Sequence, residues 1–176
     1  MLNFKKNTIK NVCLIGLMGS GKTVIGKELS QILDLNFIDT DYEIEKNTGK
    51  SIKKIFEEHD EGFFRNIEEK ICLKVLENRN SIISLGGGSI LNKNIRNSMK
   101  NNSYSIFINV DTDIILKRLG NSKKRPLLNN INKELILRNL FNERIKYYNQ
   151  ADLIINNNLD KKEIIKKITA ELKKYD

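Results

Sequence analysis

The sequence is poor in the residues that shape small secreted or metal-bound proteins. It contains two cysteines, one histidine, one proline and no tryptophan in 176 residues. Cys13 and Cys72 lie in apolar stretches without a Cys or His at metal-ligand spacing, so neither a disulfide framework nor a zinc site is predicted. We expect both to be buried, reduced thiols in a cytoplasmic protein.

Long hydrophobic runs are also missing. No apolar segment reaches the roughly 18 residues that a membrane-spanning helix needs, so we expect no membrane partner. Residues 1–11 are polar and carry lysines, and they lack the pattern of a secretory signal, so export is not expected. The length is that of one domain with a full core, and we expect residues 1–176 to form a single domain.

Positive charge exceeds negative charge, with 31 Lys and Arg against 22 Asp and Glu and a net charge of +9. Such an excess is typical either of a nucleic-acid-binding protein or of a basic protein whose ligands are anions. Near the C-terminus, however, lysines alternate at helical spacing with Ile164, Ile165, Ile168 and Leu172. This pattern favours a solvated helix face, and we expect no nucleic-acid partner.

Apolar periodicity predicts strands alternating with helices along the chain. Strands are predicted at 11–15, 36–38, 81–85, 104–110 and 153–155. Helices are predicted at 22–33, at 51–78 with a break near 60, shortly after 92, at 113–119, at 133–148 and at the C-terminus. Interleaving of this kind predicts an α/β fold with a parallel sheet covered on both faces. The polar stretch 120–130 has no core face and is predicted to be a mobile lid.

Residues 16–23 carry the strongest motif. They read Gly-Leu-Met-Gly-Ser-Gly-Lys-Thr, a GxxxxGK[ST] pattern that follows a predicted strand and opens a predicted helix. The glycines let backbone N–H groups turn toward phosphate oxygens, and the helix N-terminus adds the positive end of its dipole. Lys22 would reach the outer phosphates, and the Thr23 hydroxyl would ligate Mg²⁺. The motif predicts a nucleoside triphosphate site.

Two carboxylates, Asp39 and Asp41, directly follow the second predicted strand, where open α/β sheets bind their ligands. In an extended chain their side chains would point the same way. One would hold Mg²⁺ or its water, while the other would meet a substrate hydroxyl as base or orienting group. The alternative for either Asp alone is a helix N-cap.

Glycines 86–88 follow the third predicted strand and would let a ligand approach backbone N–H donors closely. A flexible turn is the alternative. Four arginines occur where a site above the sheet needs guanidinium groups that donate two hydrogen bonds to a carboxylate or phosphate. They are Arg65, Arg118, Arg125 and Arg144. Arg96 and Arg138 are less clearly placed, and the single histidine, His59, lies in a charged helical stretch and is predicted to be solvated.

Over essentially its whole length the chain resembles the shikimate kinase family. The shared motifs are the phosphate loop, Asp39-Thr40-Asp41, Ile55-Phe56, Phe64-Arg65 with Glu68, Gly86-Gly87-Gly88, Arg125-Pro126-Leu127-Leu128, and Arg144 with Tyr147 or Tyr148 before Ala151-Asp152. The resemblance implies a three-layer P-loop kinase fold, similar to that of nucleoside monophosphate kinases. Its five parallel strands would have the order 2-3-1-4-5, with a lid at about 120–131.

The resemblance also implies transfer of the ATP γ-phosphoryl group to the 3-hydroxyl of shikimate by a cytoplasmic monomer. The implied catalytic residues are Asp41, Lys22 and Arg125. The implied shikimate-binding residues are Asp41, Arg65, Gly87 and Arg144. The implied ATP-binding residues are Gly19, Ser20, Gly21, Lys22, Thr23, Val24, Arg118, Arg125 and Asn156. Arg118 would stack on adenine, with loop 156–159 on its other side. Mg²⁺ would bind Thr23 and, through water, Asp39.

One position departs from the family pattern, because Asp60 stands where the family usually has glycine. Since Asp60 precedes a predicted helix start, we expect it to cap that helix without loss of activity. Three rivals remain: a gluconate-type kinase, a nucleoside monophosphate kinase, and a nucleotide-gated module that binds nucleic acid. The glycine turn and Arg125-Pro126-Leu127-Leu128 argue against a gluconate-type kinase. The single arginine of the predicted lid argues against a nucleoside monophosphate kinase. Asp39, Asp41 and Arg65 argue against the nucleic-acid module, in which they would have no purpose.

Overall fold

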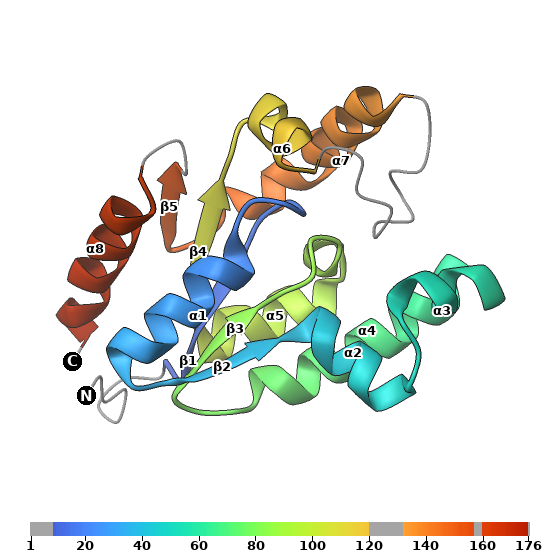
Figure 1. The fold of residues 1–176 in the computed structure, drawn as a ribbon. Helices are drawn as coiled ribbons and strands as arrows, with labels where there is room; N and C mark the ends of the chain where they lie inside the picture. Colours follow the sequence, from blue (N-terminus) through green and yellow to red (C-terminus); the bar gives the residue numbers. More distant parts are fainter. Residues whose placement is uncertain (1–8, 120–131, 157–159, 176) are drawn as a thin grey trace.

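A computed structural model describes residues 9–119, 132–156 and 160–175. Its centre is a five-stranded sheet in the order β2-β3-β1-β4-β5, and every neighbouring pair of strands is parallel (Figure 1). The strands are β1 Asn11–Ile15, β2 Asn36–Asp39, β3 Ser81–Ser84, β4 Ser103–Asn109 and β5 Leu153–Asn156. The predicted α/β class and strand order are confirmed.

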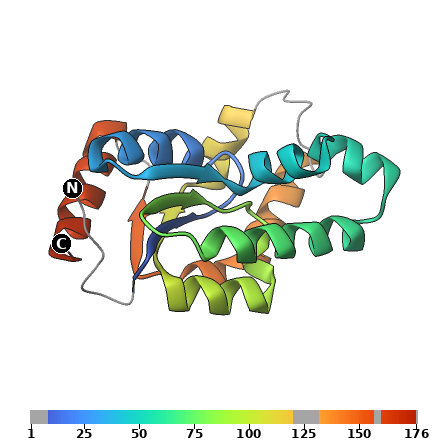
Figure 2. The ribbon, with the colours of Figure 1, turned by 90° about the horizontal axis from the view of Figure 1, so that it is seen from below.

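Helices cover both faces of this sheet. They are α1 Lys22–Leu33, α2 Thr40–Thr48, α3 Ile52–Glu58, α4 Glu61–Leu76, α5 Lys93–Asn102, α6 Thr112–Leu119, α7 Lys133–Tyr148 and α8 Lys161–Leu172, with short 3-10 turns η2 Ser89–Leu91 and η4 Lys173–Tyr175. Helices α1 and α8 pack together on one face, and α4 and α5 lie on the other (Figure 2). The result is the predicted three-layer arrangement.

Burial on both faces explains why the central strands are apolar without alternation. All five residues of β1 are buried, as are all four of β3. Cys13 and Cys72 are free, buried thiols, as predicted. Burial raises the pKa of Cys72 to about 12 and raises the pKa of Cys13 well above its ordinary value, so both are protonated at neutral pH.

The predicted break near residue 60 is confirmed. Helix α3 ends at Glu58, and α4 begins at Glu61. Asp60 is the N-cap of α4, since its side chain accepts a hydrogen bond of 2.7 Å from the Phe63 N–H. The C-terminal helix also has the predicted faces, because Ile164, Ile165, Ile168 and Leu172 are buried in α8.

The periodicity missed helix α2. It starts directly after β2 and buries only Thr40 and Ile44, so its sequence carries no apolar stripe to detect. The other differences are shifts of one or two residues at strand and helix ends, such as β2 reaching Asp39 and α4 ending at Leu76. The predicted lid and Arg125 lie outside the described residues. No helix of the described part is both long and apolar enough to cross a membrane.

Candidate active site

The loop between β1 and α1 lies at the carboxyl edge of the sheet. Gly19 and Gly21 have φ angles of 76° and 96°, a region that other residues rarely adopt. Gly21 is also the N-cap of α1, and as it has no side chain it gives α1 no side-chain cap. No side chain therefore caps the first turn of α1, where the positive end of the helix dipole would attract an anion.

Lys22 is the first residue of α1, and its side chain turns back into this loop. Its ammonium group donates to the carbonyl oxygens of Gly16 at 2.8 Å and Leu17 at 2.9 Å. The residue is only 8% exposed. The loop thus holds a buried positive charge at the place where the outer phosphates of a nucleotide would lie.

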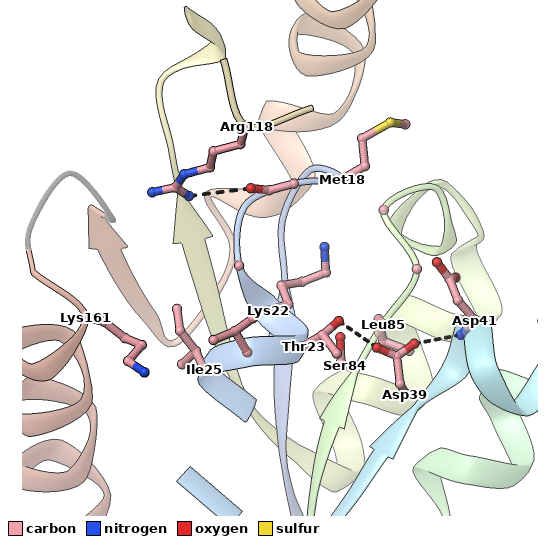
Figure 3. A pocket seen from close by; sticks show the side chains of 15 residues that line it. Met18, Lys22, Thr23, Ile25, Asp39, Asp41, Ser84, Leu85, Arg118 and Lys161 are labelled. Atoms are coloured by element: carbon pink, nitrogen blue, oxygen red, sulfur yellow. Dashed lines mark hydrogen bonds between the residues drawn. The ribbon is translucent and has the colours of Figure 1, made fainter. Parts of the chain in front are cut away.

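Asp39 connects this loop with the next strand. The Thr23 hydroxyl donates to one carboxylate oxygen of Asp39 at 2.7 Å, and the Asp41 N–H donates to the other at 3.1 Å (Figure 3). The N-cap alternative is therefore confirmed for Asp39, which caps α2. The same carboxylate still faces Thr23, so the cap does not remove it from the pocket.

The sequence analysis placed Asp41 in an extended chain, and this was wrong, because α2 begins at Thr40. Asp41 occupies the first turn of that helix. It nevertheless lines the same pocket as Asp39, because the helix starts at the strand end without an intervening loop (Figure 3).

The pocket itself has a volume of about 480 Å³ and lies above β1, β2 and β3. Its lining residues are Met18, Gly19, Gly21, Lys22, Thr23, Val24, Ile25, Asp39, Asp41, Ser84, Leu85, Gly86, Gly87, Arg118 and Lys161. Arg118 reaches over the loop from α6, with its guanidinium 3.4 Å from the Gly19 carbonyl oxygen (Figure 3). Lys161 approaches from the start of α8, where it pairs with Glu28 at 2.7 Å.

A second, smaller pocket adjoins the first. Its lining residues are Met18, Asp41, Ile52, Phe56, Phe64, Arg65, Glu68, Gly86, Gly87, Gly88 and Arg144. Four of these residues, Met18, Asp41, Gly86 and Gly87, also line the first pocket. A group bound in the second pocket would therefore meet the phosphate end of the first at Asp41.

Arg65 is fixed in the second pocket by carboxylates of its own helix, α4. It donates to Glu68 at 2.7 Å and to Glu61 at 2.8 and 3.1 Å. Glu68 is 3% exposed and also accepts a hydrogen bond of 2.9 Å from the Ser89 hydroxyl. Burial opposes the positive charge of Arg65, but Glu68 and Glu61 outweigh it and raise the pKa of the guanidinium above its ordinary value.

Arg144 contributes a second cation from α7. Its side chain is 2% exposed, and its Nε has no hydrogen-bond partner in the described structure. A buried charge with an unsatisfied donor is costly unless a ligand completes it. The arrangement therefore favours an anionic ligand in the second pocket.

The glycine turn lies between the two pockets, and polar side chains of the site approach it closely. A Cβ atom on Gly86 would lie 2.7 Å from Oδ1 of Asp41, and one on Gly88 would clash with the Arg65 guanidinium. None of the three glycines has a positive φ. A larger residue at Gly86 or Gly88 would therefore have to displace the polar end of Asp41 or of Arg65.

Comparison with known proteins identifies the family. The family model described as shikimate kinase matches residues 18–173. This chain belongs to the shikimate kinase family.

Curated relatives agree with this assignment. The chain is 41% identical over 151 residues to the shikimate kinase of Caldicellulosiruptor bescii, covering 86% of this chain and 88% of that protein. It is 38% identical over 161 residues to the shikimate kinase of Aquifex aeolicus, covering 92% and 95% of the two. Among solved structures, the shikimate kinase from Acinetobacter baumannii in complex with shikimate has a TM-score of 0.91 and 31% identity, and the match covers 98% of both chains.

Most residues predicted for a shikimate kinase site lie together in the structure. Gly19, Gly21, Lys22, Thr23, Val24, Asp39, Asp41, Gly87 and Arg118 line the first pocket, and Arg65 and Arg144 line the second with Asp41 and Gly87. Ser20 is buried within the loop. Arg125 and residues 157–159 lie outside the described residues.

Three residues named in the sequence analysis line neither of the two pockets. Asn156 ends β5, where its side chain accepts a hydrogen bond of 3.0 Å from Asn109, and it lines neither pocket. Arg138 is engaged by Asp113 and Glu134 away from both pockets. His59 is exposed, as predicted.

Sequence reasoning missed several contributors to the site. Glu68 was part of a recognised motif without a role, although its spacing of three residues from Arg65 on a helix was the available signal. Thr40 was likewise part of a recognised motif without a role, yet its hydroxyl accepts a hydrogen bond of 2.9 Å from the Gly86 N–H and joins the start of α2 to the glycine turn. Met18 and Lys161 carried no recognisable signal.

Proposed function

We propose that this chain transfers the γ-phosphoryl group of ATP to the 3-hydroxyl of shikimate. The products are shikimate 3-phosphate and ADP, a step of chorismate and aromatic amino acid biosynthesis. Membership of the shikimate kinase family supports the reaction. The structural observation that carries the proposal is the meeting of a phosphate-binding pocket and a cation-lined pocket at one carboxylate, Asp41.

The second pocket suits a small hydroxylated carboxylic acid. Arg65 and Arg144 would take the carboxylate of shikimate as forked donors, together with the Gly87 N–H. The apolar wall of Ile52, Phe56 and Phe64 would cover the ring carbons. Asp41 would accept hydrogen bonds from the ring hydroxyls and would orient or deprotonate the hydroxyl that is phosphorylated.

The first pocket suits the nucleotide. Backbone N–H groups of residues 19–24 would bind the phosphates, and Lys22 would exchange its carbonyl partners for phosphate oxygens. Arg118 would stack on adenine. Arg125 would close over the transferring group, and Asn156 would border the base, both by analogy with the family. Catalysis then rests on placement and charge neutralisation, without a covalent enzyme intermediate.

Mg²⁺ fits the Thr23 and Asp39 pair, a hydroxyl and a carboxylate 2.7 Å apart beside the phosphate loop. Mg²⁺ usually needs only one or two protein oxygens, because phosphate and water supply the rest. Within the described residues, no three His, Cys, Asp or Glu side chains gather as a metal site. When bound, the ion would neutralise charge on the phosphates while Thr23 and, through water, Asp39 hold it.

The proposal includes a monomeric, cytoplasmic enzyme without a nucleic-acid partner. The lysines of α8 support the last point, since Lys162, Lys166 and Lys167 are exposed on the side away from its buried isoleucines. This is a solvated face of an amphipathic helix.

Release of ADP from ATP and Mg²⁺ tests the proposal when it is measured with shikimate, gluconate and a nucleoside monophosphate as separate acceptors. Of the three acceptors, we expect only shikimate to support ADP release, at a rate at least about 10²-fold above the acceptor-free rate. Its rigid ring would place the carboxylate at the two arginines and the 3-hydroxyl at Asp41 at the same time. Faster release with gluconate would contradict the proposal. Steeply salt-dependent binding to DNA or RNA with no ADP release would favour the nucleic-acid module.

A further inference from the structure

Helix α7 carries two inward-facing polar residues one turn apart, Arg144 and Tyr148. They are 2% and 1% exposed. Residues four positions apart lie on the same face of a helix, so both reach the region of the glycine turn. The Tyr148 hydroxyl donates a hydrogen bond of 2.7 Å to the Gly87 carbonyl oxygen. One helix therefore supplies a cation to the second pocket and a direct bond to the backbone that lines it.

The ring of Tyr148 packs against the central sheet. It stacks on Phe107 of β4, with ring centroids 4.9 Å apart and an angle of 18° between the planes. Burial raises the pKa of Tyr148 to about 12, and the Arg144 guanidinium opposes this rise. The hydroxyl keeps its proton at neutral pH and stays a donor to Gly87.

Gly87 packs against both the phosphate loop and Arg144. A Cβ atom there would lie 3.3 Å from the Met18 nitrogen, 3.4 Å from the Gly16 oxygen and 3.6 Å from an Arg144 terminal nitrogen. The phosphate loop and Arg144 thus both lie close to the side of Gly87 from which a Cβ atom would project. A bond that holds the Gly87 carbonyl therefore also holds the turn against the loop and against Arg144.

The neighbouring Tyr147 makes a different connection. Its ring lies 4.1 Å from the guanidinium of Arg96, which donates to the carbonyl oxygens of Ile90 and Leu91 at 2.8 Å each. This contact ties α7 to α5, where Arg96 lies, and through Arg96 to η2. Tyr147 lines neither pocket. The two tyrosines therefore form a natural pair for comparison.

We propose that Tyr148 is a positioning residue for the acceptor. By holding the Gly87 carbonyl, it places the glycine turn so that backbone and Arg144 meet the same substrate carboxylate. This inference rests on the proposed function, because it takes shikimate as the acceptor. It assigns Tyr148 no contact with the substrate and no part in proton transfer.

The test is Tyr148→Phe, which keeps the ring on Phe107 and removes only the hydroxyl. We expect the KM for shikimate to rise roughly 3- to 10-fold, as loss of one hydrogen bond implies, with the KM for ATP changed less than about twofold. Tyr147→Phe makes the same chemical change one residue away and should leave both KM values within about twofold.

A neutral acceptor analogue separates positioning from a general loosening of the fold. Binding of shikimate and of its methyl ester is measured by calorimetry for both variants and the parent protein. We expect Tyr148→Phe to weaken binding of shikimate but not of the ester, which lacks the charged carboxylate. Equal losses for both ligands, an equal rise in both KM values, or behaviour matching Tyr147→Phe would overturn the inference.

The outcomes distinguish this inference from the proposed function. If the parent protein does not phosphorylate shikimate, the proposed function fails and the inference fails with it. If the parent does so and only the Tyr148 selectivity is missing, the inference alone fails. Should Tyr148→Phe not fold, Phe107→Leu removes the ring stack and keeps the hydroxyl. It should raise the KM for shikimate selectively, and a rise in both KM values or in neither would overturn the inference.

Discussion

Replacing Asp41 by asparagine is expected to lower the turnover number with shikimate about 10²- to 10⁴-fold, the range typical of a lost acid–base group. Asp41 lines both pockets at their junction, so its carboxylate is the acidic group placed to meet an acceptor hydroxyl there. Asparagine has nearly the same shape but cannot accept a proton. Nucleotide affinity should stay within about threefold, because the phosphate loop is untouched.

Asp34→Asn is the matched control for this variant. Asp34 follows α1 in the left-handed region, with a φ of 54°, and is exposed, so asparagine fits there without strain. Turnover should be unchanged in the control. Steady-state kinetics give the turnover number of both proteins, and circular dichroism shows whether they are folded. Near-normal turnover in a folded Asp41→Asn protein would contradict the role of Asp41 in orienting or deprotonating the acceptor hydroxyl.

Lys22→Met is expected to lower the turnover number about 10²- to 10³-fold, the loss typical when one preorganised donor to developing charge is removed. The ammonium group is held 2.8 Å from the Gly16 oxygen and 2.9 Å from the Leu17 oxygen, at the phosphate loop, before any ligand arrives. Methionine fills the same space without charge. The KM for ATP should rise as well, whereas direct binding of shikimate should change little because Lys22 does not line the second pocket.

Lys27→Met removes the same charge from an exposed position on the same helix and should leave turnover unaffected. Thermal unfolding of both variants reports whether loss of the two loop hydrogen bonds loosens the fold. A Lys22→Met protein that matches Lys27→Met in turnover would contradict the role of Lys22 in phosphate transfer.

The sequence predicted best where one physical pattern decided the structure. Strands buried on both faces read as unbroken apolar runs, as in β1, and the GxxxxGK[ST] motif required a strand before it and a helix after it. Capping by Asp60 followed from side-chain chemistry alone. The strand order, by contrast, came from the resemblance, because periodicity does not encode which strands are neighbours.

What the sequence could not supply depends on contacts between distant segments. Helix α2 has no apolar stripe, so the helical position of Asp41 was missed. Nothing in the sequence places Tyr148 against Gly87, 61 positions away, or shows that Arg144 is almost fully buried. The glycines of the turn were recognised, but only the packed structure shows that the Asp41 and Arg65 side chains approach the turn where a Cβ atom would lie.

The central claim is that two arginines from different helices bind one acceptor carboxylate beside the nucleotide. A crystal structure of the protein with ADP and shikimate tests it most directly. We expect the shikimate carboxylate within hydrogen-bonding distance of both Arg65 and Arg144, with the 3-hydroxyl beside Asp41 and facing the phosphate loop. A carboxylate bound away from both arginines, or a 3-hydroxyl turned away from the nucleotide, would contradict it.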